Sequence, residues 1–490
     1  MPSLPIKPIP FALGLVAFAA LAFLDSPLRD FGEYGALPAL AAGVTAWMAI
    51  WWIGEAAPLW LTALIPLALY PFTRVHGDGF GVNLLGALLP YLDPYIFLFL
   101  GGMGIAAAMQ QWNLHRRVAL AIMRRVGTAP RRLLLGVLAS TALVSLWISN
   151  TATAAMMLPI GLAVLRELER QAGRRLAGFG CAMMLAIAYG ANVGGMGTKI
   201  GTVPNAQLAG FLVQERGVDV SFLGFMAIGL PFVIAFVPVL WLALWRVGRR
   251  DAPAQAVGEA ALASEARALG PLQRAERAVM VVFVAAAALW IAGKPITDWL
   301  KLQVTAFKLG SSHVEAAIAL SASLALILWR VRGERVLAPR SFRLLQWEAL
   351  VLLGGGFSMA AAVEASGLSA WLGGQLTALR EFPAFAQVAL ASLATVTLSA
   401  FASNVATTAV MLPILVSSVS PEHTNVALVS AALASSCDFA LPAGTPPNAI
   451  VFGSGYVKVP VMARTGAALD VLAALIVSAW CWWIVPRVIG

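Results

Sequence analysis

The sequence predicts an all-α polytopic membrane protein with eleven transmembrane helices and two re-entrant hairpins in inverted repeats. The first observation is composition: of 490 residues, 60% are apolar and 11% charged, whereas soluble domains carry about 25% charged residues. The second is that apolar runs recur along the chain, since a span needs about 20 apolar residues. The third is that sequence motifs recur at a constant offset. This composition excludes a string of soluble domains and a disordered chain.

The apolar segments account for the spans and the hairpins. Residues 10–24 are interpreted as a first membrane helix rather than a signal peptide. Lys7 is the only basic residue before them, and no A-x-A cleavage site follows. Segments 133–165 and 384–418 carry a central Ser-Asn, which suits a helix start better than a helix interior. These two are predicted hairpins, with two ordinary short helices as the alternative. The other segments are 38–53, 56–72, 94–112, 177–212, 222–246, 275–293, 314–330, 346–366, 424–456 and 463–486.

The basic residues predict the orientation. With the N-terminus cytoplasmic, 24 of the 33 Lys and Arg residues fall in cytoplasmic segments and 8 in external ones. Such a bias follows the positive-inside rule. It predicts an external C-terminus. The net charge of +10 is explained by basic cytoplasmic loops, so it does not indicate that the protein binds nucleic acid. The remaining basic residue, Lys199, is assigned to membrane depth.

The repeats divide the chain. SNTATAAMMLPI (149–160) matches SNVATTAVMLPI (403–414), and GGMGIAAAMQQWNL (101–114) matches GGFSMAAAVEASGL (355–368), both at an offset of 254 residues. GTVPN (201–205) matches GTPPN (444–448). The first hairpin is expected to enter from inside and the second from outside, an inversion typical of secondary transporters. A duplicated scaffold without transport is the alternative.

The predicted parts of the chain are an N-terminal helix (1–37), repeat 1 (38–247), a loop-like cytoplasmic linker (248–274) and repeat 2 (275–490). Repeat 1 contains hairpin 133–165 and broken helix 177–212. Repeat 2 contains hairpin 384–418 and broken helix 424–456.

Each repeat contains two polar breaks that suit ions. One is the hairpin tip, and the other is a Gly- and Pro-rich interruption, at 190–205 and at 435–448. A new helix follows each Ser-Asn, and its free N–H groups and positive dipole end suit a carboxylate. The freed carbonyls of unwound backbone and nearby hydroxyl oxygens suit Na⁺. The alternative is helix capping without any ligand.

These motifs, together with LPAGTPPNAIVFGSG (441–455), resemble the divalent anion/sodium symporter family of dicarboxylate and citrate transporters over about residues 38–486. The resemblance implies an elevator-type homodimer with a mobile transport domain and a scaffold domain. It also implies that both tips hold the substrate, through Ser149, Asn150, Thr151, Ser403 and Asn404, with Val405, Thr445, Pro446 and Pro447 beside them. The implied sodium ligands are Ser145, Ser149, Asn150 and Gly197 for one ion, and Thr395, Ser399, Asn404 and Gly444 for the other.

Three residues depart from the family pattern. Val405 stands where the family usually has Thr, so one hydroxyl is lost. Lys199 lies inside the first broken helix and Asp438 inside the second, and ionised residues at membrane depth are candidates for function. Both are coupling candidates: Lys199 is expected to replace a sodium ion or pair with the anion, and Asp438 to bind a cation, carry a proton or neutralise Lys199. The alternatives for Lys199 are snorkelling or a pair with Asp438.

The sequence therefore predicts secondary active transport of a di- or tricarboxylate, such as succinate, malate, fumarate or citrate, by symport with Na⁺ across the lipid bilayer. A sodium-independent exchanger with Lys199 replacing a cation is the second choice, and a sulfate-type transporter or a channel follows. No cofactor is expected. The chain is not expected to be an enzyme, because it contains neither H-E-x-x-H nor G-x-S-x-G.

Overall fold

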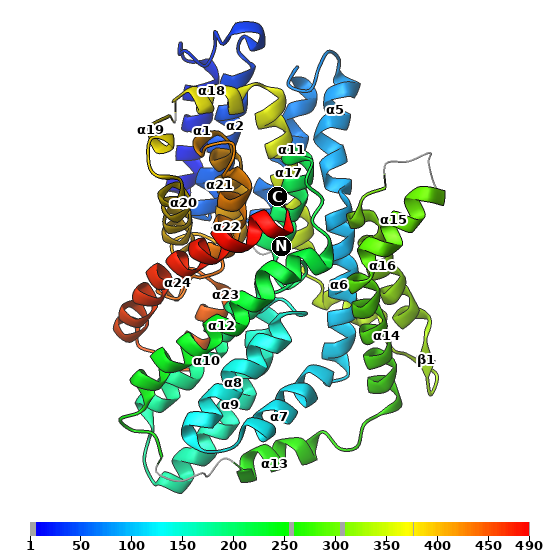
Figure 1. Ribbon diagram of the computed structural model, residues 1–490, viewed down its shortest axis with the longest axis vertical. Coiled ribbons are helices and arrows are strands. Elements are labelled where there is room, and N and C mark those ends of the chain that lie inside the picture. The colour runs from blue at the N-terminus through cyan, green and yellow to red at the C-terminus, as the bar shows by residue number, and fades with distance from the viewer. Residues whose placement is uncertain (1–5, 254–258, 304–308, 376, 490) are drawn as a thin grey trace.

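The computed structural model describes residues 6–253, 259–303, 309–375 and 377–489. Within these ranges the chain is built of α-helices (Figure 1), and its β structure is one short hairpin in which Arg330–Val331 pairs antiparallel with Glu334–Arg335. The prediction of an all-α polytopic membrane protein is confirmed. Lys308, counted above among the external residues, and residues 254–258 of the linker lie outside the described residues.

The helices before the linker begin with a proline in several cases, because the missing N–H of proline is not needed in the first turn. Short 3₁₀ helices lie at Gly32–Tyr34, Tyr70–Phe72 and Leu89–Leu92. In chain order the α-helices are α1 (Pro8–Phe23), α2 (Leu37–Gly54), α3 (Leu59–Thr62), α4 (Ile65–Leu69), α5 (Phe80–Leu88), α6 (Pro94–Gln111), α7 (Leu114–Val126), α8 (Pro130–Ser145), α9 (Asn150–Ala172), α10 (Ala177–Gly195), α11 (Val203–Arg216) and α12 (Phe222–Gly248).

The rest of the chain contains a 3₁₀ helix at Pro339–Leu344. Its α-helices are α13 (Glu259–Ala268), α14 (Arg274–Ile291), α15 (Gly293–Gln303), α16 (Ser311–Leu328), α17 (Trp347–Ala365), α18 (Leu368–Gln375), α19 (Thr377–Arg380), α20 (Ala384–Ser399), α21 (Asn404–Ser418), α22 (Thr424–Ala434), α23 (Pro446–Phe452) and α24 (Val459–Val488).

Among the described residues, eight helices are long and apolar enough to span a membrane, or nine if α14 and α15, bent by 67°, count as one span. The expected number was eleven. Several segments that we counted as single spans consist of shorter helices. Examples are α22 and α23, neither of which is long enough to span a membrane alone. One of the eight is α9, which lies in a segment expected to be a hairpin arm. The count of eleven spans and two hairpins therefore stays a prediction.

The linker between the repeats is not wholly loop-like, as we had expected. Residues 259–268 (EAALASEARA) form helix α13, since Ala, Glu and Arg are strong helix formers. This helix packs against α7 and α9, and Glu265 forms an ion pair with Arg116 of α7. The next helix adds a second link, from Glu276 to Arg117 at 3.0 Å. The linker is therefore attached to the first repeat.

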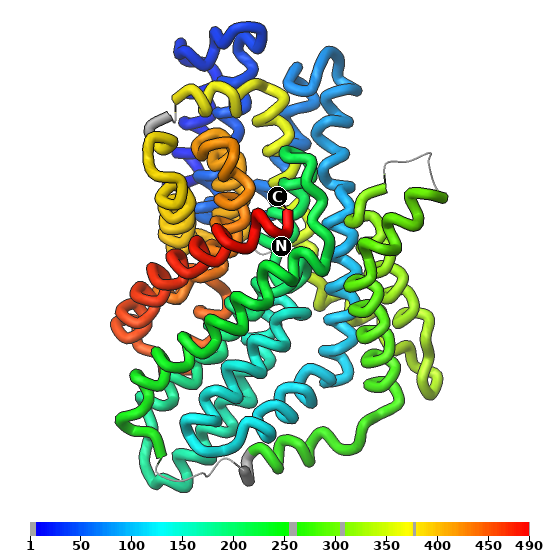
Figure 2. The backbone as a smooth tube through the Cα atoms, viewed as in Figure 1, coloured from blue at the N-terminus to red at the C-terminus, as the bar shows by residue number. Residues whose placement is uncertain are grey.

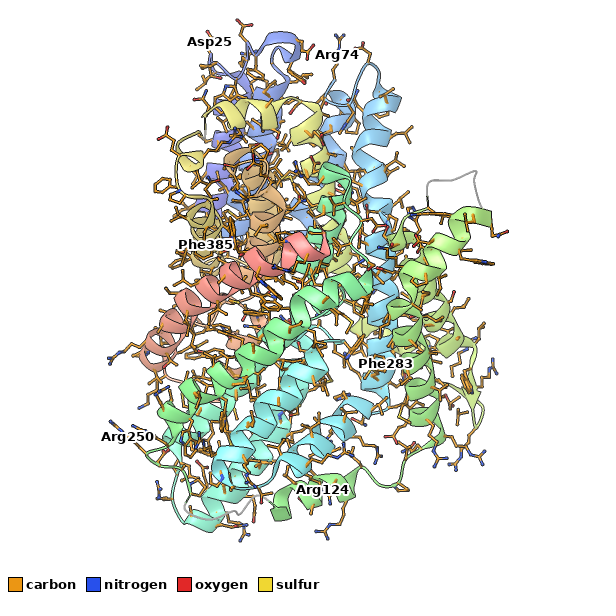
Figure 3. All side chains as sticks on the ribbon, in the orientation of Figure 1. Asp25, Arg74, Arg124, Arg250, Phe283 and Phe385 are labelled. Carbon is orange, nitrogen blue, oxygen red and sulfur yellow. The ribbon has the colours of Figure 1, made fainter. Side chains whose placement is uncertain are left out.

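The two helix pairs that flank the Ser-Asn motifs occupy different halves of the molecule. In Figure 1, α8 and α9 lie in the lower half, whereas α20 and α21 lie in the upper left. The backbone trace in Figure 2 shows α14 and α16 beside α6, on the right of the molecule. Figure 3 places Arg124 and Arg250, expected inside, toward the lower end and Arg74, expected outside, at the upper end.

The centre of the packing is α10. Of its apolar stretch, 89% is buried inside the protein. The helix contacts α8, α9, α12 and α23. Its glycines permit this crowding, because a Cβ at Gly194 would collide with the main chain of Ala142 in α8. A Cβ at Gly195 would likewise collide with the Asn150 side chain, so the end of this helix lies against the first Ser-Asn motif.

Candidate functional site

One cavity of about 650 Å³ lies where both Ser-Asn tips and both helix breaks come together. Its walls come from segments that are distant in sequence, from Leu59 to Pro447. All the residues expected to bind substrate line it: Ser149, Asn150, Thr151, Ser403, Asn404, Val405, Thr445 and Pro446.

The first tip connects α8 to α9. The hydroxyl of Ser145, at the end of α8, lies 3.0 Å from Asn150 Oδ1 and 2.6 Å from the carbonyl oxygen of Ala191 in α10. Ser145 is fully buried and Asn150 nearly so. These contacts tie the start of α9 to the end of α8 and to α10, which fixes where the free N–H groups of α9 point.

The second tip, between α20 and α21, has the same arrangement. Ser399 Oγ lies 2.9 Å from Asn404 Oδ1 and 2.7 Å from the carbonyl oxygen of Ser435, at the end of α22. In each repeat a serine thus contacts the asparagine five residues later and the carbonyl of a broken helix. Sodium prefers such hydroxyl, amide and carbonyl oxygens.

The tips differ in how the serine before each asparagine is used. Ser403 Oγ accepts a hydrogen bond from the N–H of Ala406, so it caps its own helix. Ser149 Oγ instead accepts from Gln346 Nε2 at 2.9 Å, so it is held by the segment that precedes α17. With Val405 in place of a threonine, the second tip also has one hydroxyl fewer than the first.

The first helix break runs from Met196 to Thr202, between α10 and α11. Asn205 Nδ2 donates to the carbonyl oxygens of Gly195 (2.9 Å) and Thr198 (2.7 Å), and this stabilises the unwound backbone. Thr198 Oγ1 donates to Leu146 O of the tip at 2.5 Å. Gly197 packs against the Leu146 side chain, so the structure brings this sodium candidate beside the first tip.

The second break, between α22 and α23, is stabilised in the same way. Asn448 Nδ2 donates to the carbonyl oxygens of Asp438 (3.1 Å) and Leu441 (2.9 Å). Asn192 Nδ2 of α10 reaches across to Thr445 Oγ1 and to Asp438 O, each at 3.2 Å. The two breaks are thereby joined through α10.

The other two candidate ligands of the second sodium ion, Thr395 and Gly444, do not contact Asn404 in the way that Ser399 does. Thr395 lies one turn before Ser399, and its hydroxyl donates to Ala391 O within α20. Gly444 lies against the carboxylate of Asp438, where any Cβ would collide with that carboxylate. Within the described ranges, no group of three or more His, Cys, Asp or Glu side chains is placed to hold a metal ion.

Lys199 is paired with a residue that we did not predict. Its ammonium lies 2.7 Å from Glu315 Oε2 of α16 and 5.2 Å from the ring centre of Tyr95, and both members of the pair are fully buried. The alternatives of a pair with Asp438 or of snorkelling are wrong. Glu315 also accepts from the N–H of Phe222 at 2.6 Å. Lys199 does not line the cavity.

The sequence analysis missed part of the cavity wall. Asn192 lies within a segment that we considered but did not single out. Gln346 directly precedes α17 and Glu348 lies in its first turn, where no local pattern marks them. Among the residues that the structure describes, the lining includes no Lys, Arg or His, and Glu348 is its one acidic residue. An anion bound here would therefore need helix N-termini and accompanying cations for its charge.

Comparison with known proteins gives matches over most of the chain. A family model described as "Sodium:sulfate symporter transmembrane region" matches residues 35–488. The sodium-dependent dicarboxylate transporter SdcS of Staphylococcus saprophyticus is 34% identical over 488 residues, covering 97% of this chain and 90% of that protein. The protein of the same name from Staphylococcus aureus is 34% identical over 459 residues, covering 91% of this chain and 86% of its own.

Two solved structures share the fold at low identity. The YdaH transporter of Alcanivorax borkumensis aligns with a TM-score of 0.55 and 16% identity, covering 98% of this chain and 97% of its own. MtrF of Neisseria gonorrhoeae, described within a class of antimetabolite efflux pumps, aligns with a TM-score of 0.57 and 12% identity, covering 97% and 93%. At these identities the likeness concerns the fold alone.

Proposed function

The chain belongs to the family described as the sodium:sulfate symporter transmembrane region, and from this premise we propose that it is a secondary transporter that moves a dicarboxylate inward together with Na⁺. Membership of a transporter family confirms the prediction that the chain is not an enzyme. Relatives 34% identical to it are named sodium-dependent dicarboxylate transporters, and this supports both the substrate class and the coupling ion.

The observation that carries the proposal is a cavity that both Ser-Asn tips line. Helices α9 and α21 both begin at this cavity, so two positive helix ends and two sets of free N–H groups meet there. Two tips suit the two carboxylates of one substrate. Ser149, Asn150 and Thr151 would bind one, and Ser403 and Asn404 the other.

Sodium supplies the charge that the cavity wall lacks. We assign one ion to Ser145, Asn150 and the Gly197 region, and another to Ser399, Asn404 and the Gly444 region, with Thr395 behind them. The sodium-independent exchanger that we considered needs Lys199 to act as the replacement cation. The pairing of Lys199 with Glu315 disfavours this, because its charge is already balanced.

The transport domain would comprise the helices that build the two tips and breaks, α8 to α11 and α20 to α23, and the scaffold would include α14 to α17. Binding anion and cations together would let the domain cross the bilayer as a unit, because their charges offset one another in a low-dielectric setting. We further propose a homodimer in the inner membrane, with the N-terminus cytoplasmic and the C-terminus external.

Uptake of labelled succinate into proteoliposomes tests the proposal. Uptake is expected to require an inward sodium gradient and to proceed without internal dicarboxylate. Uptake that ignores sodium but requires internal succinate would indicate an exchanger instead. Failure to move succinate, malate, fumarate or citrate under any gradient would overturn transport of this substrate class.

Val405→Thr is expected to strengthen substrate binding, because it restores a hydroxyl at the second tip. One hydrogen bond contributes about 0.5–1.5 kcal/mol, equivalent to a decrease of about 2- to 12-fold in KM for the dicarboxylate. The measurement is initial uptake rate against substrate concentration at saturating sodium. Val410→Thr, on the same helix but away from the cavity, is the matched control and should leave KM unchanged. An unchanged KM in Val405→Thr as well would mean that this side chain does not face the substrate.

A further inference from the structure

The second break contains a buried carboxylate without a partner. Asp438 is fully buried, and neither of its carboxylate oxygens has a hydrogen-bond partner among the described residues. A carboxylate removed from water without donors or a counter-charge is strongly unfavourable. The local structure therefore favours neutralisation of this carboxylate, by a proton or by a positively charged partner.

The protein does not provide that charge. Lys199, the basic residue of the first break, is bound to Glu315. None of the ion pairs formed by the described residues includes Asp438. Another acid, Asp470 of α24, lies against the residue that follows Asp438. Asp470 itself accepts a hydrogen bond from the N–H of Phe439 at 2.8 Å.

Two unpaired amide oxygens belong to side chains that contact the main chain of Asp438. Asn448 and Asn192 both donate their Nδ2 hydrogens to the carbonyl oxygen of Asp438, while their own Oδ1 atoms are buried and unpaired. Acceptors without donors are the opposite of what a carboxylate needs from its neighbours, and they are the ligands that a hard cation takes. Gly444 adds room, because only a residue without Cβ fits beside the Asp438 carboxylate.

Comparison with the first break shows that this carboxylate is present in only one of the two repeats. Asn205 bonds the carbonyls ten and seven residues before it, those of Gly195 and Thr198, just as Asn448 bonds those of Asp438 and Leu441. Gly195 thus occupies the place that Asp438 takes in the second repeat. The first break has no acid there, so the feature belongs to the second break alone.

We propose that Asp438 binds a sodium ion in the second break, together with the amide oxygens of Asn448 and Asn192. The inference deepens the proposed function, since it names a charged ligand for the second sodium. A carboxylate attracts a cation more strongly than neutral oxygens do. All three proposed ligands belong to the protein, so sodium is expected to bind here without dicarboxylate.

The test is sodium-dependent thermal stability of the purified full-length protein without dicarboxylate. The probe is NaCl, titrated against choline chloride at constant ionic strength, because a ligand that binds only the folded state raises Tm. We expect Tm of the wild type to rise with sodium. The half-saturating sodium concentration should increase at least about tenfold in Asp438→Asn, an isosteric change worth about 1.4 kcal/mol of binding.

Two further variants make the test specific. Asp470→Asn also removes a buried carboxylate, but one that has a backbone donor, and should keep the wild-type half-saturating concentration. Asn192→Leu removes a proposed ligand on another helix and should raise it, and this tests the site even if Asp438→Asn does not fold. An unchanged sodium titration in Asp438→Asn, or no stabilisation of the wild type by sodium, would overturn the site.

The result is separable from that of the uptake experiment. If no dicarboxylate is transported but the stabilisation by sodium still depends on Asp438, the proposed function fails and the cation site stands. If uptake is sodium-dependent in both wild type and Asp438→Asn with the same half-saturating sodium concentration, the proposed function stands and the cation site fails.

Discussion

Lys199→Met is expected to lower the free energy of unfolding by about 3–5 kcal/mol, because breaking a buried ion pair leaves the other charge uncompensated. Glu315 is fully buried, and after the substitution it would keep only the N–H of Phe222 as a donor. The measurement is unfolding in detergent, by heat or denaturant, at fixed sodium concentration. The stability of this variant has to be measured first, because a loss of transport could simply reflect unfolded protein.

Two controls separate the buried pair from the loss of a lysine in general. Lys7→Met breaks the pair with Glu55, whose side chains are 57% and 63% exposed, and exposed pairs contribute about 0–1 kcal/mol. The double variant Lys199→Met/Glu315→Gln removes both charges but keeps an acceptor for Phe222, and it should regain much of the lost stability. Equal stability of Lys199→Met and wild type would show that Glu315 is not held as an ion at this position.

Asn150→Ala is expected to reduce kcat/KM for dicarboxylate uptake by about 10- to 150-fold, since a hydrogen bond to a charged group contributes about 1.5–3 kcal/mol. Asn150 begins α9, lines the cavity and contacts Ser145 through its Oδ1. Removing its amide would withdraw one group from the substrate and one oxygen from the first sodium. The half-saturating sodium concentration for uptake should therefore rise together with KM.

The matched control is Asn425→Ala, because Asn425 bonds Arg216 at an exposed position away from the cavity. Uptake by this variant should stay within about twofold of wild type, as expected of a surface substitution. If Asn150→Ala transports with wild-type KM and sodium dependence, the first tip does not bind the ions, and the capping alternative is the better explanation of its sequence.

The parts of the site that were predictable are those with a local chemical cause. Ser-Asn in an apolar run marks a helix start, and Gly, Pro and Asn together mark unwound backbone, so the tips and breaks could be located before their distances were known. Their meeting at one substrate site was an expectation that came from the family resemblance, and the structure brings all eight residues to one cavity.

The parts that were missed depend on tertiary packing. Glu315 lies 116 residues from Lys199, on a helix whose sequence gives no sign of which partner it faces. Gln346 reaches Ser149 across 197 residues, and nothing in its own segment marks it as part of a cavity. Helix α13 was missed for a different reason, because its charged, Ala-rich sequence suits both a solvated loop and a helix.

The burial of α10 also bears on how the protein assembles during synthesis. This helix leaves the ribosome long before α23 and α24 exist, yet Tyr189 on α10 donates a hydrogen bond to Phe439, 250 residues later. Until then, one side of a glycine-rich helix must rest against lipid or the insertion machinery. The first repeat therefore completes its packing only after the second helix break has been synthesised.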